Sequence, residues 1–428
     1  MQLAIALALF LPTSVAWAQY KSDEIDISLR AKGTLAKKYA SNPTGEASNK
    51  QLFENYIGKY YIPIMTNSDA MALGELGKLR YELFRQYVWP AQPAVQTWLT
   101  ETLQKRMQAI YQDPAYHPSV RYNALLVIGM LDDQYGIDAA ANKRPPKPSV
   151  EANKFLVGVL AKGYKDASVP PAMIVGALIG LERHAKYRAS LPQDAQNTMT
   201  KGFMAIAQLE KFPQEMNRSA RNWIRIQAAS GLVEFGTLGD NAQHHQTLIK
   251  LIDDPALNVE DRCQVAGLIA RLPYKAGDAI DGPGTLKSLT QLAVDYGADE
   301  AKIAQKFIDM QIGVEGFFAG NPAGAVDGFR VENGRLLYER RRPVGYLTDI
   351  QDALKAIEPA VSDDQKKVIQ SLQPAIKPVM DLGTNKDSSD LELAQAIQRM
   401  AQEFNLIAPT AGAKPVELEK QRRSVGIF

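Results

Sequence analysis

Residues 107–131 read MQAIYQDPAYHPSVRYNALLVIGML, and residues 248–272 read LIKLIDDPALNVEDRCQVAGLIARL. When the two stretches are aligned, Asp113-Pro114-Ala115 falls on Asp254-Pro255-Ala256, and Arg121 falls on Arg262. Proline has no N–H and disfavours helical geometry in the residue before it, so the first helix of each stretch must end at the aspartate. Each stretch therefore predicts a helix, a break and a second helix, which is the unit of an α-helical repeat.

Apolar residues recur at three- and four-residue spacing through most of the chain, which is typical of amphipathic helices. A lone helix pair cannot bury its whole apolar face, so we expect neighbouring pairs to cover one another. The pattern predicts upstream helices at 49–61 and 68–88, and five helix pairs at 94–111 with 119–132, 151–163 with 170–184, 193–211 with 219–235, 242–253 with 259–272, and 285–296 with 300–312.

A short motif recurs on the second helices of these pairs. Val120-Arg121-x-x-Ala124 returns as Ile224-Arg225-x-x-Ala228, and more weakly as Asp261-Arg262-x-x-Val265. On these residues the chain resembles the HEAT-repeat family over residues 68–312, whose units of about 40 residues pair two antiparallel helices. The resemblance implies an all-α fold, an irregular α-α solenoid. It also implies a ladder between neighbouring repeats, made by loop aspartates and second-helix arginines, here Asp113, Arg121, Arg225, Asp254 and Arg262.

Residues 313–345 depart from the helical pattern. Gly316, Gly320, Gly324 and Gly328 fall at every fourth position, and glycine at that density disfavours a helix. Asn333-Gly334 follows between two short apolar-rich runs, which is the strongest short-range signal for a β-hairpin. We therefore expect a glycine-rich loop and a small β-hairpin inserted in the helical fold.

Arginines close this hairpin. Arg340, Arg341 and Arg342 stand in a row after it, and Arg335 lies within its second run. Guanidinium groups on a hairpin that projects from a helical body suit carboxylate or phosphate groups, so these four residues are our candidate binding residues. The alternative interpretation is an edge strand that is guarded by its charges.

The two ends of the chain differ from the middle. Residues 1–18 carry an apolar run and then Ala16-Trp17-Ala18, a pattern that predicts a signal peptide cleaved near Ala18 and export to the periplasm or the extracellular space. No later apolar run is long enough to span a bilayer, so we expect no transmembrane segment in the mature chain. The expected organisation is a flexible segment at 19–48, the repeat domain at 49–312, the insertion at 313–345, C-terminal helices at 346–407 (348–357, 362–372 and 389–404) and a flexible tail at 408–428.

Several classes of chemistry find no support in the residues. The formal net charge of +2 gives no general drive toward nucleic acid, so none is expected as a partner. Adjacent helical residues point about 100° apart, so His244 and His245 cannot face one metal, and neither His117 nor His184 lies in a metal motif. We interpret Cys263 and Trp223 as core residues. The acid pairs at 132–133, 253–254, 299–300 and 363–364 fall at predicted helix ends. No catalytic residue, metal or cofactor is predicted.

The sequence therefore favours an exported, non-catalytic helical-repeat scaffold that binds a protein or an envelope partner. Two other functions remain open. One is an enzyme on a closed α/α toroid that acts on polysaccharide, and the other is a structural component of a secreted assembly.

Overall fold

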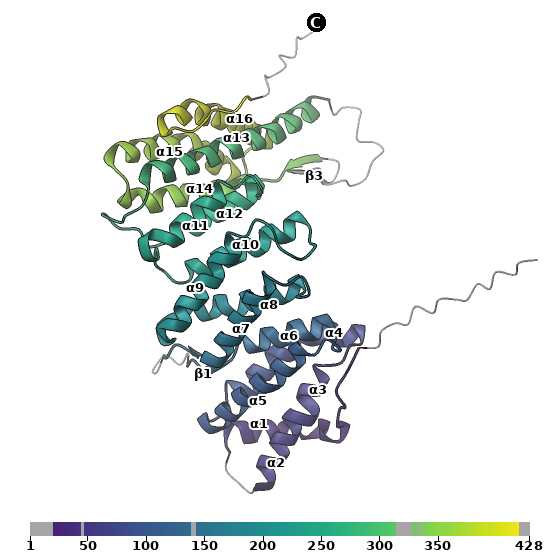
Figure 1. Cartoon of the computed structure of the whole chain (residues 1–428). Coiled ribbons are helices and arrows are strands. Elements are labelled where there is room, and N and C mark those ends of the chain that lie inside the picture. The colour runs from purple at the N-terminus through teal and green to yellow at the C-terminus, as the bar shows by residue number, and fades with distance from the viewer. Residues whose placement is uncertain (1–19, 44–46, 138–142, 314–327, 333–334, 419–428) are drawn as a thin grey trace, which may run out of the picture. The chain divides into compact units, whose positions relative to one another are not determined.

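The computed structural model describes residues 20–43, 47–137, 143–313, 328–332 and 335–418 (Figure 1). The chain divides into two compact units, unit 1 (Met1–Tyr135) and unit 2 (Gly136–Phe428), and both consist mostly of helices. The repeat domain predicted at 49–312 is thus shared between two units. The predicted signal peptide, the connection at 314–327 and the Asn333-Gly334 turn lie outside the described residues. Among the described helices, none is long and apolar enough to cross a membrane.

Unit 1 begins with helical segments where the sequence analysis expects a flexible chain. Asp26 caps the first of them by accepting the N–H of Ser28, and Ala36 and Ala40 are fully buried one helical turn apart. Burial of this stripe packs the described part of 19–48 against the rest of unit 1 as helices. The elements are η1 (Ile27–Lys32), α1 (Gly33–Ser41), α2 (Ala47–Asn55), the π-helical η2 (Tyr56–Tyr61), α3 (Ile62–Ile64), α4 (Ala70–Leu83), the π-helical η3 (Phe84–Val88), α5 (Pro93–Gln112), α6 (Pro118–Ile128) and β1 (Asp132–Gln134).

Unit 2 contains three of the predicted helix pairs and then a less regular region. Its elements are β2 (Lys147–Pro148), α7 (Val150–Gly163), α8 (Pro171–Lys186), η4 (Arg188–Ser190), α9 (Gln193–Ala207), α10 (Arg218–Val233), η5 (Asp240–Ala242), α11 (Gln243–Ile252), α12 (Val259–Ile269), α13 (Gly282–Gly313), β3 (Phe329–Glu332), β4 (Arg335–Tyr338), α14 (Arg341–Ile357), η6 (Glu358–Ala360), α15 (Asp363–Thr384), α16 (Asp390–Ile407) and η7 (Ala408–Ala411).

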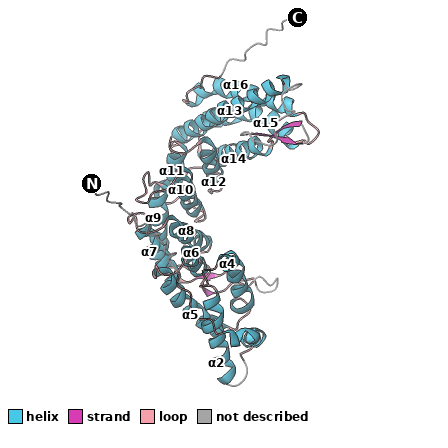
Figure 2. Ribbon diagram, turned by 90° about the vertical axis from the view of Figure 1, so that its right-hand side faces the viewer, coloured by secondary structure: helices cyan, strands magenta, loops and turns pink. Residues whose placement is uncertain are grey.

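The helices of unit 2 stack in two layers (Figures 1 and 2). First helices of the pairs pack side by side in the order α7, α9, α11, α13, and second helices do so in the order α8, α10, α12, α14. The last two helices close the stack, because α16 covers α13 and α15 packs between α14 and α16. Glu182 of α8 accepts hydrogen bonds from Gln227 and Ser230 of α10, which joins neighbouring helices of the second layer.

The repeated Asp-Pro-Ala phrase has the same local structure in both copies. Asp113 Oδ1 accepts the N–H of Ala115 at 3.0 Å, and Asp254 Oδ1 accepts the N–H of Ala256 at 2.8 Å. Such a turn satisfies backbone groups that the ending helix leaves unpaired. In the second copy, Asn258 then caps the start of α12 by accepting the N–H of Asp261.

The fifth predicted pair, 285–296 with 300–312, is wrong. These residues form one helix, α13, which continues through Asp299 and Glu300. Gly297 does not break it, because α16 packs on this position: a Cβ on Gly297 would lie 3.0 Å from Phe404 Cδ2. The second helix of this pair is α14, so the hairpin is inserted in the loop between the two helices of one pair.

Two predicted boundaries in the C-terminal helices are also wrong, while the other two helix starts lie within one residue of the prediction. The predicted start at residue 348 is too late, because α14 already begins at Arg341. The predicted end at residue 372 is too early, since α15 continues through Pro374 and Pro378. Ser362 and Ser389, at the other two predicted starts, both form complete capping boxes.

The start of the predicted flexible tail is held by hydrogen bonds. The side-chain amide of Asn405 donates to the carbonyl of Val416 and accepts the N–H of Val416. The side-chain amide of Gln291 of α13 makes the same two bonds with Lys414. Residues 408–418 are therefore packed on unit 2, and residues 419–428 lie outside the described part.

The hairpin itself forms as the sequence predicts. Strands β3 and β4 are antiparallel, and their register pairs Phe329 with Tyr338 and Glu332 with Arg335. The inner face packs on α13, since the rings of Phe329 and Tyr338 lie 6.3 and 5.3 Å from the ring of Phe307.

One arginine of the implied ladder joins two helix pairs. Arg225 of α10 is buried; its Nε donates to the carbonyl of Ala207 at the end of α9, and its Nη2 lies 2.5 Å from Asp254 Oδ2 in the loop between α11 and α12. Its guanidinium thus closes its own pair and binds the next one. Arg262 of α12 likewise binds the next helix, through Asp295 of α13 at 3.0 Å.

The other two ladder residues make different contacts. Arg121 donates from Nε to the carbonyl of Tyr111 at 2.8 Å, the local bond that Arg225 makes to Ala207. Asp113 pairs with Lys21 at 2.8 Å and not with an arginine. Within unit 1 the aspartate therefore binds the chain that precedes the helices.

The buried Arg225–Asp254 pair leads to a test by mutation. Asp254→Ala leaves the Arg225 guanidinium without its acid in a site where its side chain is 5% exposed, so we expect the free energy of unfolding to fall by about 3 kcal/mol. Urea unfolding of the full chain measures the change. Asp381→Ala removes an exposed acid on α15 and is the control, for which we expect no measurable change. Equal effects of the two substitutions would contradict the ladder contact.

Candidate functional site

The structure separates the four candidate arginines. Arg340 precedes α14 and is fully engaged within the chain: Nε lies 2.5 Å from Asp390 Oδ1, and Nη1 donates to the carbonyls of Leu382 and Asn385 and to Ser388 Oγ. It ties the end of the hairpin to the loop between α15 and α16. These bonds leave Arg340 a structural role instead of the predicted binding role.

Arg341 and Arg335 are placed less specifically. Arg341 is the first residue of α14 and is exposed. Arg335 begins β4 opposite Glu332, and its side chain lies outside the described part of the structure. Neither is brought to the other arginines by an interaction that the described residues make.

Arg342 lies on the surface of a groove and contacts two carboxylates. Its Nη2 donates to Glu260 Oε1 of α12 at 2.7 Å, and its Nε lies 3.6 Å from Glu300 Oε2 of α13. Because α14 begins directly after the hairpin, Arg342 joins the insertion to both layers of the helical stack. Among the candidate arginines, Arg342 also lines open space.

Glu300 is the buried centre of this site. Its carboxylate is fully buried and accepts hydrogen bonds from the hydroxyls of Tyr338 at 2.7 Å and Tyr296 at 3.2 Å. Burial raises the pKa of the Glu300 carboxyl, and the positive charge of Arg342 opposes that rise. Burial also raises the pKa of Tyr338, so its hydroxyl remains a donor. Three elements, α13, β4 and α14, are thus joined at one carboxylate.

The open space beside Arg342 is a groove of about 930 Å³, which we call the hairpin groove. Its floor is α13, one wall is the start of α12, and the other wall is the base of the hairpin with the start of α14. Charges of both signs line it. The lining residues are Asn258, Glu260, Asp261, Gln264, Asp299, Lys302, Ile303, Lys306, Gly328, Phe329, Glu339, Arg342 and Tyr346.

Some charges of the groove are already paired and others are not. Asp299 pairs with Lys302 at 3.0 Å, and Asp261 accepts from the amide of Asn222 at 2.8 Å. Lys306 and Glu339 are exposed, and among the contacts of the described residues no ion pair involves either side chain. These two side chains are therefore available to a ligand.

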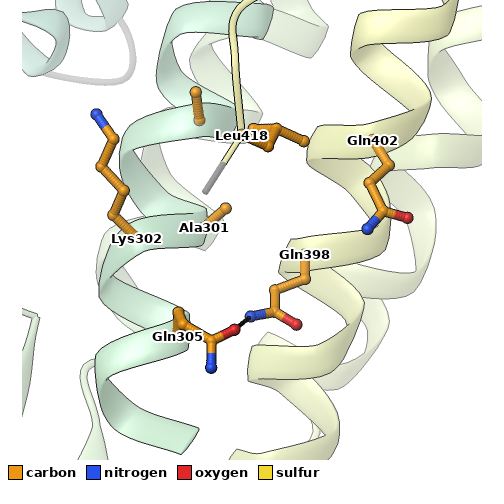
Figure 3. A pocket seen from close by; sticks show the side chains of 7 residues that line it. Ala301, Lys302, Gln305, Gln398, Gln402 and Leu418 are labelled. Atoms are coloured by element: carbon orange, nitrogen blue, oxygen red, sulfur yellow. Dashed lines mark hydrogen bonds between the residues drawn. The ribbon is translucent and has the colours of Figure 1, made fainter. Parts of the chain in front are cut away.

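A second, enclosed space between α13 and α16 is too small to be a site (Figure 3). Its volume is about 40 Å³, which suits about one water molecule. Gln398 donates to Gln305 across it at 2.5 Å, while Lys302 extends away from both glutamines.

His244, His245 and Cys263 are buried in the core. His245 is buried between Tyr274 Oη and Thr285 Oγ1, each 2.8 Å away, and burial lowers its pKa to about 4. His244 faces the carbonyl of Thr237 instead, so the two rings do not converge. Burial raises the pKa of the Cys263 thiol, which keeps it protonated and unreactive. The described residues include no group of three or more metal ligands.

The prediction that Trp223 lies in the core is wrong, because its side chain is 46% exposed on α10. The helix buries Asn222, Ile224 and Arg225 beside it, so the polar neighbours occupy the inward face. A helical pattern could not show this, because the inward arginine is stabilised by Asp254, a residue of the next pair.

The hydrogen-bonded cluster of Glu300, Tyr296 and Tyr338 is not among the sites predicted from the sequence. Asp299-Glu300 is predicted at the start of a helix, whereas both residues lie within α13. The signal was present: Leu289, Ala293, Tyr296, Glu300, Ala304 and Phe307 continue one stripe at three- and four-residue spacing. An acid within such a stripe indicates a buried carboxylate with partners.

Comparisons of the chain with protein families, with curated proteins and with solved structures find no match.

The raised pKa of Glu300 predicts how its contribution to stability changes with pH. Its folded pKa lies above the ordinary value of 4.5, so the folded protein favours the protonated carboxyl. The stability of the natural chain relative to Glu300→Gln should then be highest below about pH 4.5 and fall as the pH rises through the folded pKa. Urea unfolding of both proteins between about pH 4 and pH 8 measures this difference. A difference in stability that is constant, or that grows with pH, would show that burial does not control the pKa of this carboxyl.

Proposed function

We propose that this chain is an exported, non-catalytic scaffold of HEAT-like helical repeats that binds a protein or envelope partner in the hairpin groove. The observation that carries the proposal is the groove itself. It lies where the hairpin interrupts one helix pair, and it offers charged side chains of both signs beside a guanidinium that two acids hold in place.

The repeat character is supported by contacts that recur from pair to pair. The same Asx turn follows α5 and α11, and an arginine of the second helix binds the end of the first helix in two pairs. Stacked pairs of this kind typically present an extended surface to a partner. Trp223 is an exposed aromatic residue of α10, and tryptophan is enriched among residues that dominate binding energy.

Unpaired charges at the groove support a polar macromolecular partner. Lys306 on the floor and Glu339 on the wall are exposed, and Ile303 supplies an apolar contact between the two lysines of α13. An interface with an apolar centre and a charged rim is the usual composition for protein–protein contacts.

Export rests on the pattern at 3–18, and a periplasmic or extracellular location follows from it. The other two interpretations have less support. A polysaccharide hydrolase needs two carboxylates that face a substrate. In the hairpin groove Glu260 pairs with Arg342, Asp299 pairs with Lys302 and Asp261 accepts from Asn222, whereas Glu339 makes no ion pair with a described residue. The described residues likewise show no feature that favours a structural component of a secreted assembly.

Site-specific photo-crosslinking tests the proposed binding site. A photoreactive residue at Lys306 should trap one partner in the cells that make the protein, and the same residue at Lys367, an exposed lysine of α15, should not. The recovered partner is then purified and titrated with the full chain. Lys306→Glu should weaken binding about tenfold, because it reverses a charge at the groove, and Lys367→Glu should leave affinity unchanged.

Two results would overturn the proposal. One is a crosslink pattern that is the same at both positions, and the other is a partner whose affinity does not respond to Lys306→Glu. Either result would contradict binding at the groove and would not contradict the described fold.

A further inference from the structure

The outer edge of β3 has backbone groups that no other described residue pairs with. Glu339 N–H donates to Gly328 C=O at 2.9 Å, so in the register of the hairpin Gly328, Arg330 and Glu332 bond to β4. The N–H and C=O groups of Phe329 and Val331 therefore point away from β4. In the described part of the chain these outward groups make no hydrogen bond.

The opposite edge of the hairpin, along β4, is covered. The outward N–H of Tyr338 in β4 donates to Asp390 Oδ2 at 2.9 Å, so the start of α16 protects that edge. Proteins usually cover or charge exposed strand edges because such edges pair readily with other chains. An edge that the described residues leave uncovered, next to a covered one, thus marks a place where a strand can be added.

The hairpin groove reaches the start of this edge. Gly328 and Phe329 belong to its wall, and Ile303 and Lys306 of α13 form the floor beneath. Since Phe329 and Tyr338 place the inner face of the sheet on Phe307 of the same helix, a further strand beside β3 would lie on α13 in the same layer. Neighbouring strands are about 4.8 Å apart, so the floor residues are within its reach.

We propose that the hairpin groove receives an extended segment of the partner protein, which pairs with β3 as a third, added strand. This inference rests on the proposed function and names the form of the bound partner. Backbone hydrogen bonds to Phe329 and Val331 supply affinity, and alternate side chains of the segment face α13. An apolar side chain fits over Ile303, and an acidic one fits beside Lys306.

A second copy of this chain is a poorer occupant. It would bring β3 into the groove together with its own α13, which covers the inner face of that strand. The groove between the start of α12 and the hairpin would then have to hold a helix as well as a strand. A single extended segment needs less room.

Removal of one edge N–H tests the proposal. Val331→Pro deletes an outward donor and leaves the bonds between β3 and β4, whereas Val331→Ala shortens the same side chain and keeps the donor. Short random peptides displayed on phage are selected on the full natural chain, and the selected peptide is synthesised as the probe. Val331→Pro should weaken its binding about tenfold relative to Val331→Ala.

Hydrogen exchange on the natural chain tests the same point without a variant. Peptide binding should slow exchange of the Phe329 and Val331 amides at least about tenfold and leave Arg330, which is already bonded to β4, unchanged. This measurement decides the matter if Val331→Pro disrupts the hairpin. Selection of no peptide that protects these two amides would overturn the proposal.

The remaining outcomes separate the two proposals. If Lys306→Glu weakens binding of the recovered partner but Val331→Pro matches Val331→Ala, the groove binds a partner without strand addition, and only this inference fails. If neither variant changes that affinity, the proposed function fails as well. A dimer of the natural chain in light scattering that Val331→Pro abolishes would assign the edge to a second copy and would also overturn the inference.

Discussion

A helix pair has one apolar face that it cannot cover by itself, and the architecture of unit 2 follows from this constraint. Each pair is covered by the next, and polar side chains fix the spacing where the layers meet. Arg225 shows the principle, because one guanidinium binds the end of its own pair and the loop aspartate of the following pair. The final pair is covered by α15 and α16, which end the stack.

The hairpin groove is a consequence of how this stack is interrupted. Helix α13 is longer than the first helices before it, and its C-terminal half carries the hairpin that is inserted before α14. Glu300 sits where these elements meet, and burying its carboxylate costs free energy that two tyrosine hydroxyls and Arg342 offset in part. The same contacts hold Arg342 and the base of the hairpin in place beside the open space. Structural bonds and the candidate binding surface are therefore parts of one network.

Much of the fold could be predicted from local patterns. The helix pairs at α5–α6, α7–α8, α9–α10 and α11–α12, the hairpin and the cap at Ser362 all depend on residues close together in the sequence. The site could be predicted only in part. Arg342 belongs to the arginine cluster that the sequence shows. Arg340 belongs to the same cluster, but its side chain is bound by Asp390 and by the carbonyls of a loop about 50 residues away, and no local pattern predicts these partners.

The sequence by itself determined that helices end at Asp-Pro and that two strands flank Asn-Gly, because the backbone preferences of proline and of Asn-Gly hold whatever surrounds them. Tertiary structure decided the rest. It made α13 continuous by packing α16 on Gly297, placed Trp223 outside and Arg225 inside, and buried Glu300 among partners from three elements. Charged and aromatic side chains take either environment, and the choice depends on partners that only the folded chain brings within hydrogen-bonding distance.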